Sequence, residues 1–353
     1  MMMIFFNLQF AITYQIFLDG TTFTKNSGTN VWNMFNALPG TMTQLQSTLN
    51  KDNVESFTKD GNDMQSIYIS GLASSTSLSQ LEYMSQSING AGIEKIGLLA
   101  YEFLVQRMHN NSAGADTIKI IGFSRGAATA RMLCTYLSLY GITSSNLAPS
   151  VSTTSSLTNF EASLLNPNQA SVVGKIPKIH FLGLFDTVAG LGLHQAAGRI
   201  IGTSDLVKMS MNIPSIVEIC AHAVAINEVR ADFQYTPINI TRSWRELFFI
   251  GSHVDIGGFQ NSNRQKVALQ WMITQSGIKF LGSITISQEE LIKIGNISPI
   301  IDTIRRAEIY GGVIRRSVDI TRLADSVKIF ANTRQIQYSQ VTDTVLVESI
   351  TNK

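Results

Sequence analysis

A serine between two glycines is the residue of this sequence best placed for covalent chemistry. Residues 122–126 read Gly-Phe-Ser-Arg-Gly, a G-x-S-x-G pentapeptide centred on Ser124. An apolar run at 117–122 precedes it and a helix-forming segment at 127–140 follows it, and this order of strand, tight turn and helix is the setting of a nucleophile elbow. The alternative is a glycine-rich turn whose serine caps the helix. The context favours a nucleophilic serine.

Among the five histidines, His253 is the predicted base for this serine. A serine hydroxyl attacks an ester only when a base removes its proton, and a carboxylate must hold that base in the correct tautomer. His253 follows directly on an expected strand, downstream of Ser124, in a turn rich in small residues. The other four are expected at a helix C-terminus, in a strand, in a loop and on a helix face: His109, His180, His194 and His222.

Asp186 is the predicted acid of the triad. It ends the apolar run at 178–185, at the sheet edge where the acid of such a triad belongs. Asp255 is two residues from His253 and is the alternative, although a strand-like alternation would point its side chain away from the histidine. The non-catalytic interpretations are helix capping for Asp186 and turn stabilisation for Asp255.

Backbone N–H groups are expected to stabilise the oxyanion that forms during attack on an ester. One comes from Arg125, the residue after the nucleophile, and the best second source is the turn at Gly20 and Thr21. Asp19 lies beside that turn, where it could orient a water, bind an ion or fix the turn. Asp19 and Asp255 are therefore expected just behind the reacting groups.

No cofactor and no metal is predicted. The sequence has no pair of histidines with the spacing of a zinc site. Its two cysteines, Cys134 and Cys220, are too few for a disulfide scaffold or a four-cysteine zinc site, and both are expected buried on helices.

Strands that alternate with helices over about 250 residues predict an α/β fold with a mainly parallel sheet and helices on both faces. Strands are expected at 14–18, 66–70, 117–122, 178–185 and 246–250. Helices are expected at 31–38, 93–108, 127–140, 158–165, 216–231 and 266–275. Two excursions, 144–175 and 189–214, are candidate lids over the site. The organisation predicted is a catalytic domain at 1–280 with an extension at 281–353 packed on the same domain.

The composition excludes some classes of partner. The 27 basic and 25 acidic residues leave a net charge of +2, and only 15% of residues are charged. Such a chain has no field that would gather nucleic acid. Residues 1–18 are mostly apolar, but no basic residue precedes Lys25, so they are interpreted as mostly buried strand and not as a cleavable signal peptide.

Four motifs occur in one order: 17–21 (FLDGT), 122–127 (GFSRGA), 184–188 (LFDTV) and 253–258 (HVDIGG). The chain in this respect resembles the α/β-hydrolase domain family of formerly unknown function that includes the first class of type VI secretion lipase effectors. The resemblance extends from residue 14 to about residue 280 and includes 29–31 and 268–272. It implies that Ser124 is the nucleophile, Asp186 the acid and His253 the base.

The chain departs from the family pattern at three places near these motifs. Phe259 stands where the family usually has a third glycine, and Thr22-Phe23 where an asparagine usually comes soon after the Asp-Gly-Thr turn. Asn227 replaces an aspartate. None of these changes removes a triad residue, but the two phenylalanines are expected to reshape the pocket.

The function predicted is that of a serine-dependent lipid ester hydrolase of phospholipase A type, working through an acyl-enzyme. The expected substrate is a lipid or another acyl ester, and the protein is expected to contact the membrane surface peripherally. The resemblance is consistent with a secreted effector, and the sequence leaves open any delivery or neutralising partner protein. The alternatives are an acyltransferase or thioesterase on the same triad, because the sequence does not distinguish water from another acceptor, or a non-catalytic binding module.

Overall fold

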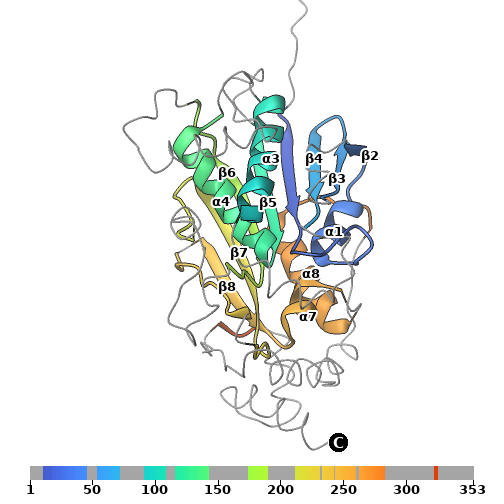
Figure 1. The fold of residues 1–353 in the computed structure, drawn as a ribbon, viewed down its shortest axis with the longest axis vertical. Coiled ribbons are helices and arrows are strands. Elements are labelled where there is room, and N and C mark those ends of the chain that lie inside the picture. The colour runs from blue at the N-terminus through green and yellow to red at the C-terminus, as the bar shows by residue number, and fades with distance from the viewer. Residues whose placement is uncertain are drawn as a thin grey trace, which may run out of the picture.

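The computed structural model describes ten stretches of the chain, which hold the sheet and the helices around it (Figure 1). They are 11–45, 54–71, 91–108, 116–142, 174–189, 211–230, 233–241, 243–259, 262–282 and 322–324. Residues 1–10 and most of both predicted excursions lie outside them, as do the helix expected at 158–165, His109 and His194.

An eight-stranded sheet forms the centre of the molecule, with the order β2-β3-β4-β1-β5-β6-β7-β8. Six neighbouring strands are parallel: β4 (Met64–Ile69), β1 (Thr13–Leu18), β5 (Thr117–Phe123), β6 (Ile179–Phe185), β7 (Val217–Ala225) and β8 (Trp244–Phe249). Two antiparallel strands extend one edge: β2 (Thr41–Leu45) and β3 (Ser56–Asp60).

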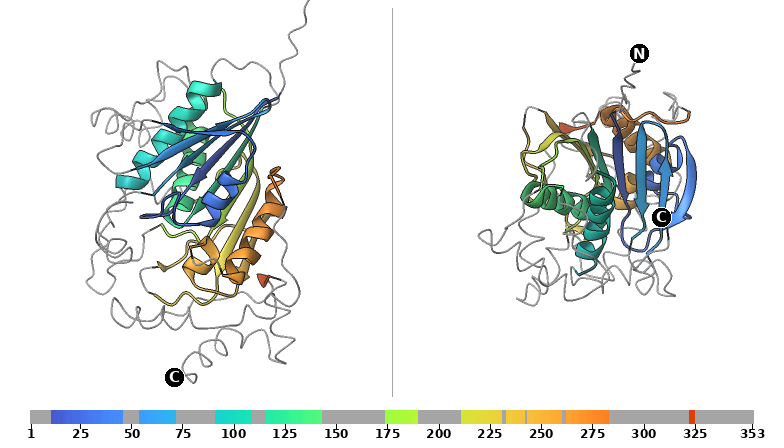
Figure 2. Two further views of the ribbon diagram at one scale, coloured as in Figure 1. Left: turned by 90° about the vertical axis from the view of Figure 1, so that its right-hand side faces the viewer. Right: turned by 90° about the horizontal axis from the view of Figure 1, so that it is seen from above.

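Helices cover both faces of the sheet, which explains why its central strands are apolar on both sides. One face carries α3 (Ala91–Met108) and α4 (Arg125–Tyr140), and the other carries α1 (Asn30–Asn36), α7 (His253–Gly257) and α8 (Asn263–Ser276) (Figure 2). Each face has its own cluster of buried apolar side chains. The predicted α/β fold with a mainly parallel sheet is confirmed.

The prediction of a helix at 216–231 is wrong. Val217–Ala225 is the strand β7, and it lies between β6 and β8. A strand that is buried on both faces has no polar side and therefore no alternation to reveal it, so its apolar residues match a helical period equally well. His222 and Cys220, expected on a helix, are thus strand residues with fully buried side chains.

The two antiparallel strands β2 and β3 are absent from the predicted elements. All five residues of β2 are exposed or half-buried, which is usual for a strand at the edge of a sheet. The segment therefore has no apolar pattern to indicate a strand. The remaining predicted strands and helices that fall on described residues are confirmed, with bounds that shift by a few residues.

The strand order places the chemistry-bearing residues at one edge of the sheet. After β1 the chain forms β2, β3 and β4 on one side of β1, and it then crosses over to form β5 on the other side. In open parallel sheets, ligands bind beyond the carboxyl ends of the strands at such a reversal. Asp19 follows β1, Ser124 follows β5 and Asp186 follows β6 at this edge.

None of the helices in the described stretches is both long enough and apolar enough to span a bilayer.

Two glycines around Ser124 allow the backbones to approach closely. A β-carbon on Gly126 would collide with the carbonyl oxygen of Leu18 in β1, and one on Gly122 would collide with the carbonyl oxygen of Gly126. Strand β5, the turn and the start of α4 fit against β1 only because both side chains are missing.

We expect Gly126→Ala to lower the free energy of unfolding by about 1–3 kcal/mol, because backbone atoms have to shift to admit the methyl group. Gly61→Ala is the matched control, since its nearest neighbours would lie 3.9 Å from the new β-carbon. Chemical denaturation of both variants measures the difference. Equal midpoints for the two variants would contradict this account of the turn.

Candidate active site

Ser124 lies in the turn between β5 and α4 with a backbone conformation that residues other than glycine rarely adopt. Its φ is 56° and its ψ is −121°, and such strain persists only where the surroundings over-determine it. The N–H of Ser124 donates to the carbonyl oxygen of Phe185 at 2.9 Å, and its carbonyl oxygen accepts from the N–H groups of Ala127 and Ala128. The turn is therefore fixed from both sides by neighbouring backbone.

His253 links Ser124 to Asp186 through two short hydrogen bonds. The Nε2 atom of His253 lies 2.8 Å from the Oγ of Ser124, and its Nδ1 lies 2.7 Å from Oδ2 of Asp186. A carboxylate only accepts, so Nδ1 carries the proton and Nε2 is left to accept from the serine hydroxyl. All three side chains are fully buried. The structure thus brings together the three residues predicted as a triad, whose catalytic roles stay predictions.

Asp186 is held by backbone groups of the next strand. Its N–H donates to the carbonyl oxygen of Ala223 at 2.7 Å, and its Oδ1 accepts from the N–H of Ala225 at 3.0 Å. Its φ of 42° lies in the left-handed region. The carboxylate is turned toward His253 by this conformation and is satisfied on both oxygens.

Burial lowers the pKa of His253 below the ordinary value of 6.5, an effect that the hydrogen bond and charge of Asp186 oppose only in part. The N–H of His253 donates to Oε2 of Glu228, whose carboxylate also receives two hydrogen bonds from the Arg230 guanidinium. The rings of Phe123 and Phe233 pack against the imidazole with centroid distances of 4.7 and 4.9 Å. Burial thus favours the neutral form of the imidazole, and two aromatic rings pack against it.

Asp255 does not take part in this chain of hydrogen bonds. Its carboxylate accepts from the N–H and hydroxyl of Ser252 at 2.9 Å and from the hydroxyl of Ser262, and it pairs with Arg264 at 3.4 Å. A carboxylate in the first turn of α7 that accepts from the residue before the helix stabilises the helix N-terminus. The turn-stabilising alternative for Asp255 is the one that the geometry supports.

Asp19 fixes the turn after β1. Its carboxylate accepts from the N–H of Gly20 at 2.8 Å and from the hydroxyls of Thr29 at 2.6 Å and Tyr68 at 2.8 Å. Burial raises its pKa to about 6, against the effect of these three hydrogen bonds. Through the bonds to Thr29 and Tyr68, Asp19 ties the turn to α1 and β4. Within the described stretches, no group of three or more potential ligands could hold a metal ion.

The two N–H groups expected from the turn after β1 differ in availability. Because the N–H of Gly20 donates to Asp19, the expectation that it serves the oxyanion conflicts with the geometry. Thr21 is buried in the same turn, and its Oγ1 accepts from the Arg125 guanidinium at 3.3 Å. Arg125 opens α4, in the first turn, where N–H groups have no acceptor inside the helix. The N–H groups of Thr21 and Arg125 are the expected donors that do not conflict with this bond, and their role stays a prediction.

Aromatic rings line the region beside Ser124. A β-carbon on Gly20 would lie 3.1 Å from both the Phe23 ring and Cβ of Ser124, so this ring is close to the serine. Phe23 contacts the rings of Phe123 and Phe259 with centroid distances of 5.3 and 5.5 Å. Phe259 is 43% exposed and has a φ of 148°, which favours glycine. Phe23, Phe123 and Phe259 are called the aromatic wall below. They form a row of contacts from the ring of His253 to the protein surface.

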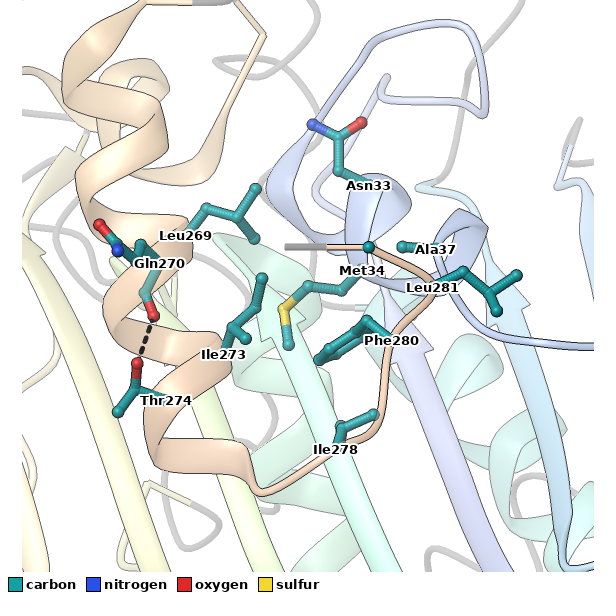
Figure 3. A pocket seen from close by; sticks show the side chains of 11 residues that line it. Asn33, Met34, Ala37, Leu269, Gln270, Ile273, Thr274, Ile278, Phe280 and Leu281 are labelled. Carbon is teal, nitrogen blue, oxygen red and sulfur yellow. Dashed lines mark hydrogen bonds between the residues drawn. The ribbon is translucent and has the colours of Figure 1, made fainter. Parts of the chain in front are cut away.

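A separate hollow of about 340 Å³ lies between α1, α8 and residues 278–282 (Figure 3). Met34, Ile273 and Phe280 face one another across it. Neither Ser124 nor His253 lines it, so it belongs to the packing between the two helices and not to the candidate site.

Several residues that hold the site were not assigned a role from the sequence. Thr29, Tyr68 and Glu228 bind the carboxylate of Asp19 or the backbone of His253. Thr29 and Glu228 stand in segments compared with the family pattern, which could have indicated them. His222 was hidden because its strand was interpreted as a helix.

A comparison with models of protein families finds a match to this chain. The family model described as the catalytic domain of the Tle1-like phospholipase effector of the type VI secretion system matches residues 14–275. The comparison with curated proteins found no match.

Two solved structures are similar at low identity. The Tle1 effector bound to the VgrG spike from the type VI secretion system is 20% identical, with a TM-score of 0.39, and the match covers 72% of this chain and 52% of that one. An uncharacterized protein from Pseudomonas aeruginosa is 16% identical, with a TM-score of 0.45, over 96% of this chain and 62% of that one. The chain spans less than two thirds of either.

The family match covers more than half of the chain and includes Ser124, Asp186 and His253. The chain belongs to the family of Tle1-like phospholipase effector catalytic domains of the type VI secretion system.

Proposed function

We propose that this chain is a serine-dependent lipid ester hydrolase of phospholipase A type. The observation that carries the proposal is the continuous hydrogen-bonded path from Ser124 through His253 to Asp186, fully buried at the carboxyl edge of the sheet. Membership of a phospholipase effector family supports a lipid substrate.

In the proposed mechanism Ser124 attacks the ester carbonyl while Nε2 of His253 takes the hydroxyl proton. Asp186, which accepts from Nδ1, stabilises the imidazolium that forms. The backbone N–H groups of Arg125 and Thr21 stabilise the oxyanion. His253 then gives its proton to the leaving alcohol, and an acyl-enzyme on Ser124 remains. Water activated by His253 releases the fatty acid in the second half of the reaction.

The aromatic wall supports an acyl chain as the group that lies beside Ser124. Phe23 is buried next to the serine and Phe259 extends the same apolar surface outward. Packing an alkyl chain against this surface would stabilise its binding by about 25 cal/mol per Å² of apolar area removed from water. Both phenylalanines stand where the family pattern usually has other residues, so they would give this surface a shape that differs from the usual one.

We further propose that the chain acts as a secreted effector, delivered with the help of a partner protein. The description of its family as type VI secretion effectors supports this.

The catalytic domain is proposed to span 1–280, with 281–353 as an extension packed on it. Residues 322–324 support this, because they lie along β8. Leu323 bridges to Phe248, the N–H of Ala324 donates to the carbonyl oxygen of Phe248 at 3.0 Å, and Arg322 pairs with Glu246 at 2.8 Å. Most of the extension lies outside the described residues.

Ser124→Ala should reduce phospholipid hydrolysis at least about 10³-fold, because the nucleophile is lost while the fold is kept. Mass spectrometry of lipid products measures both rate and specificity. The wild type should release fatty acid and lysophospholipid. Equal rates for the two proteins, or release of diacylglycerol or phosphatidic acid in place of fatty acid, would overturn the proposal. An unchanged unfolding midpoint shows that the variant folds.

Asp186→Asn should lower kcat by about 10⁴-fold, because an amide stabilises neither the required tautomer nor the imidazolium. Asp255→Asn is the matched control and should stay within about tenfold of the wild type, since the Asp255 carboxylate bonds to Ser252, Ser262 and Arg264 and not to the His253 imidazole. Hydrolysis of a short soluble ester compares the two. The assignment of the acid is wrong if the two variants exchange these effects.

The acid limb of the pH profile of kcat/KM should have its midpoint below 6.5. His253 must be neutral to act as a base, and burial lowers its pKa, so it stays neutral as the pH falls through the ordinary histidine range and becomes protonated only below it. Stopped assays on a soluble ester, read at one alkaline pH, give the profile. A midpoint above 6.5 would contradict this assignment of the base.

A further inference from the structure

A second buried pair of histidine and carboxylate lies behind the turn that carries Asp186. His222 on β7 pairs directly with Glu246 on β8 in the register of the two parallel strands, and Nδ1 of the imidazole lies 2.9 Å from Oε2 of the carboxylate. Both side chains are fully buried. Neither residue belongs to the path from Ser124 to Asp186.

The other ring nitrogen of His222 binds the backbone next to Asp186. The N–H of Thr187 donates to Nε2 of His222 at 3.0 Å. A backbone N–H can only donate, so Nε2 must carry a lone pair and Nδ1 must carry the proton that Glu246 accepts. This tautomer is the less common one for a neutral imidazole in water. An imidazolium has no lone pair and would break the bond to Thr187.

The turn that His222 binds is strained. Asp186 has a φ of 42°, and a side chain in that region costs of order 1–3 kcal/mol unless the surroundings hold it. Backbone groups of the turn bond to residues outside β6. The N–H of Asp186 donates to Ala223, the carbonyl oxygen of Thr187 accepts from the N–H of Thr236, and the N–H of Thr187 donates to His222.

Burial and the charge of Arg131 favour the neutral form of His222, whereas the carboxylates of Glu246 and Asp186 act in the opposite direction. Glu246 also accepts from the N–H of Ile238 at 2.9 Å and from Arg322 at 2.8 Å. Burial would raise its pKa, but these bonds and the one from His222 hold it below the ordinary value. Arg131, buried on α4, donates to the carbonyl oxygens of Thr236 and Pro237. Burial lowers the pKa of His222, against the effect of Glu246 and the nearby Asp186.

We propose that His222 is a positioning residue for the catalytic acid. Held by Glu246 as the Nδ1–H tautomer, it accepts the N–H of Thr187 and thereby keeps Asp186 in the left-handed conformation that aims its carboxylate at His253. The proposal rests on the proposed function only in taking Asp186 as the acid. The pair His222–Glu246 does not itself exchange a proton with substrate.

Nitrogen-15 NMR of the histidine side chains tests the geometry in the wild-type protein, without any substrate. His222 should show a protonated Nδ1 and an unprotonated Nε2 at neutral pH. The opposite tautomer, or an imidazolium, would overturn the proposal. This readout stands even if the chain hydrolyses no ester, in which case the proposed function fails and the hydrogen bond is judged separately.

Kinetics on a soluble ester tests the consequence. His222→Leu removes the acceptor for Thr187 and should lower kcat by about 10-fold to 100-fold, as a small misplacement of a catalytic group does, with KM changed less than about twofold. His222→Gln offers a carbonyl oxygen to the same N–H and should recover most of the loss. His180→Leu, on the neighbouring strand β6 and half-exposed, is the matched control and should match the wild type.

Two results would overturn the proposal. One is equal kcat for His222→Leu and the wild type, and the other is equal losses for the Leu and Gln variants, which would indicate packing and not an acceptor. Should the Leu variant fail to fold, the Gln variant still decides. It should keep kcat and the downfield Nδ1 proton resonance of His253, and loss of both would contradict the proposal.

Discussion

The arrangement depends on one costly requirement, a carboxylate buried in the protein and aimed at a neutral imidazole. An ionised group away from water is tolerated only when its lone pairs are satisfied. Asp186 meets this with the N–H of Ala225 on one oxygen and Nδ1 of His253 on the other. Three parallel strands must end at the same edge in a fixed register to supply these groups. The order β5-β6-β7-β8 and the elbow at Ser124 are what satisfy that requirement.

Strain and support are paired around the site. Ser124 and Asp186, at the ends of adjacent strands, both have positive φ values. Each turn is held by backbone bonds to the next strand, including the one from the N–H of Ser124 to the carbonyl oxygen of Phe185. Glu228 and, by our proposal, His222 extend the same principle. Glu228 accepts from the N–H of His253, and His222 accepts from the N–H of Thr187, the residue after Asp186. Rigid elements thus hold the side chains, and the rings of Phe123 and Phe233 pack against His253.

The parts of this site that could be predicted from sequence are those with local signals. The glycines near Ser124 indicate that backbone segments approach each other closely there. Asp186 and His253 each follow a strand that the sequence pattern predicts. β7 was misassigned because a strand buried on both faces has no period of its own, and with it the setting of His222 was lost. β2 was missed because an exposed edge strand has no apolar pattern. The use of the Gly20 N–H by Asp19 depends on a side-chain rotation that no spacing of residues reveals.

The central claim is that Ser124 is made nucleophilic by His253 in the folded chain. The most direct measurement is mass-spectrometric mapping of the adduct formed with a fluorophosphonate, which reacts with activated serines. The account predicts one adduct on Ser124 in the wild type and its loss in His253→Ala, with the unfolding midpoint retained as evidence of folding. No adduct on the folded wild type, an adduct on another residue, or equal labelling of Ser124 in His253→Ala would contradict it.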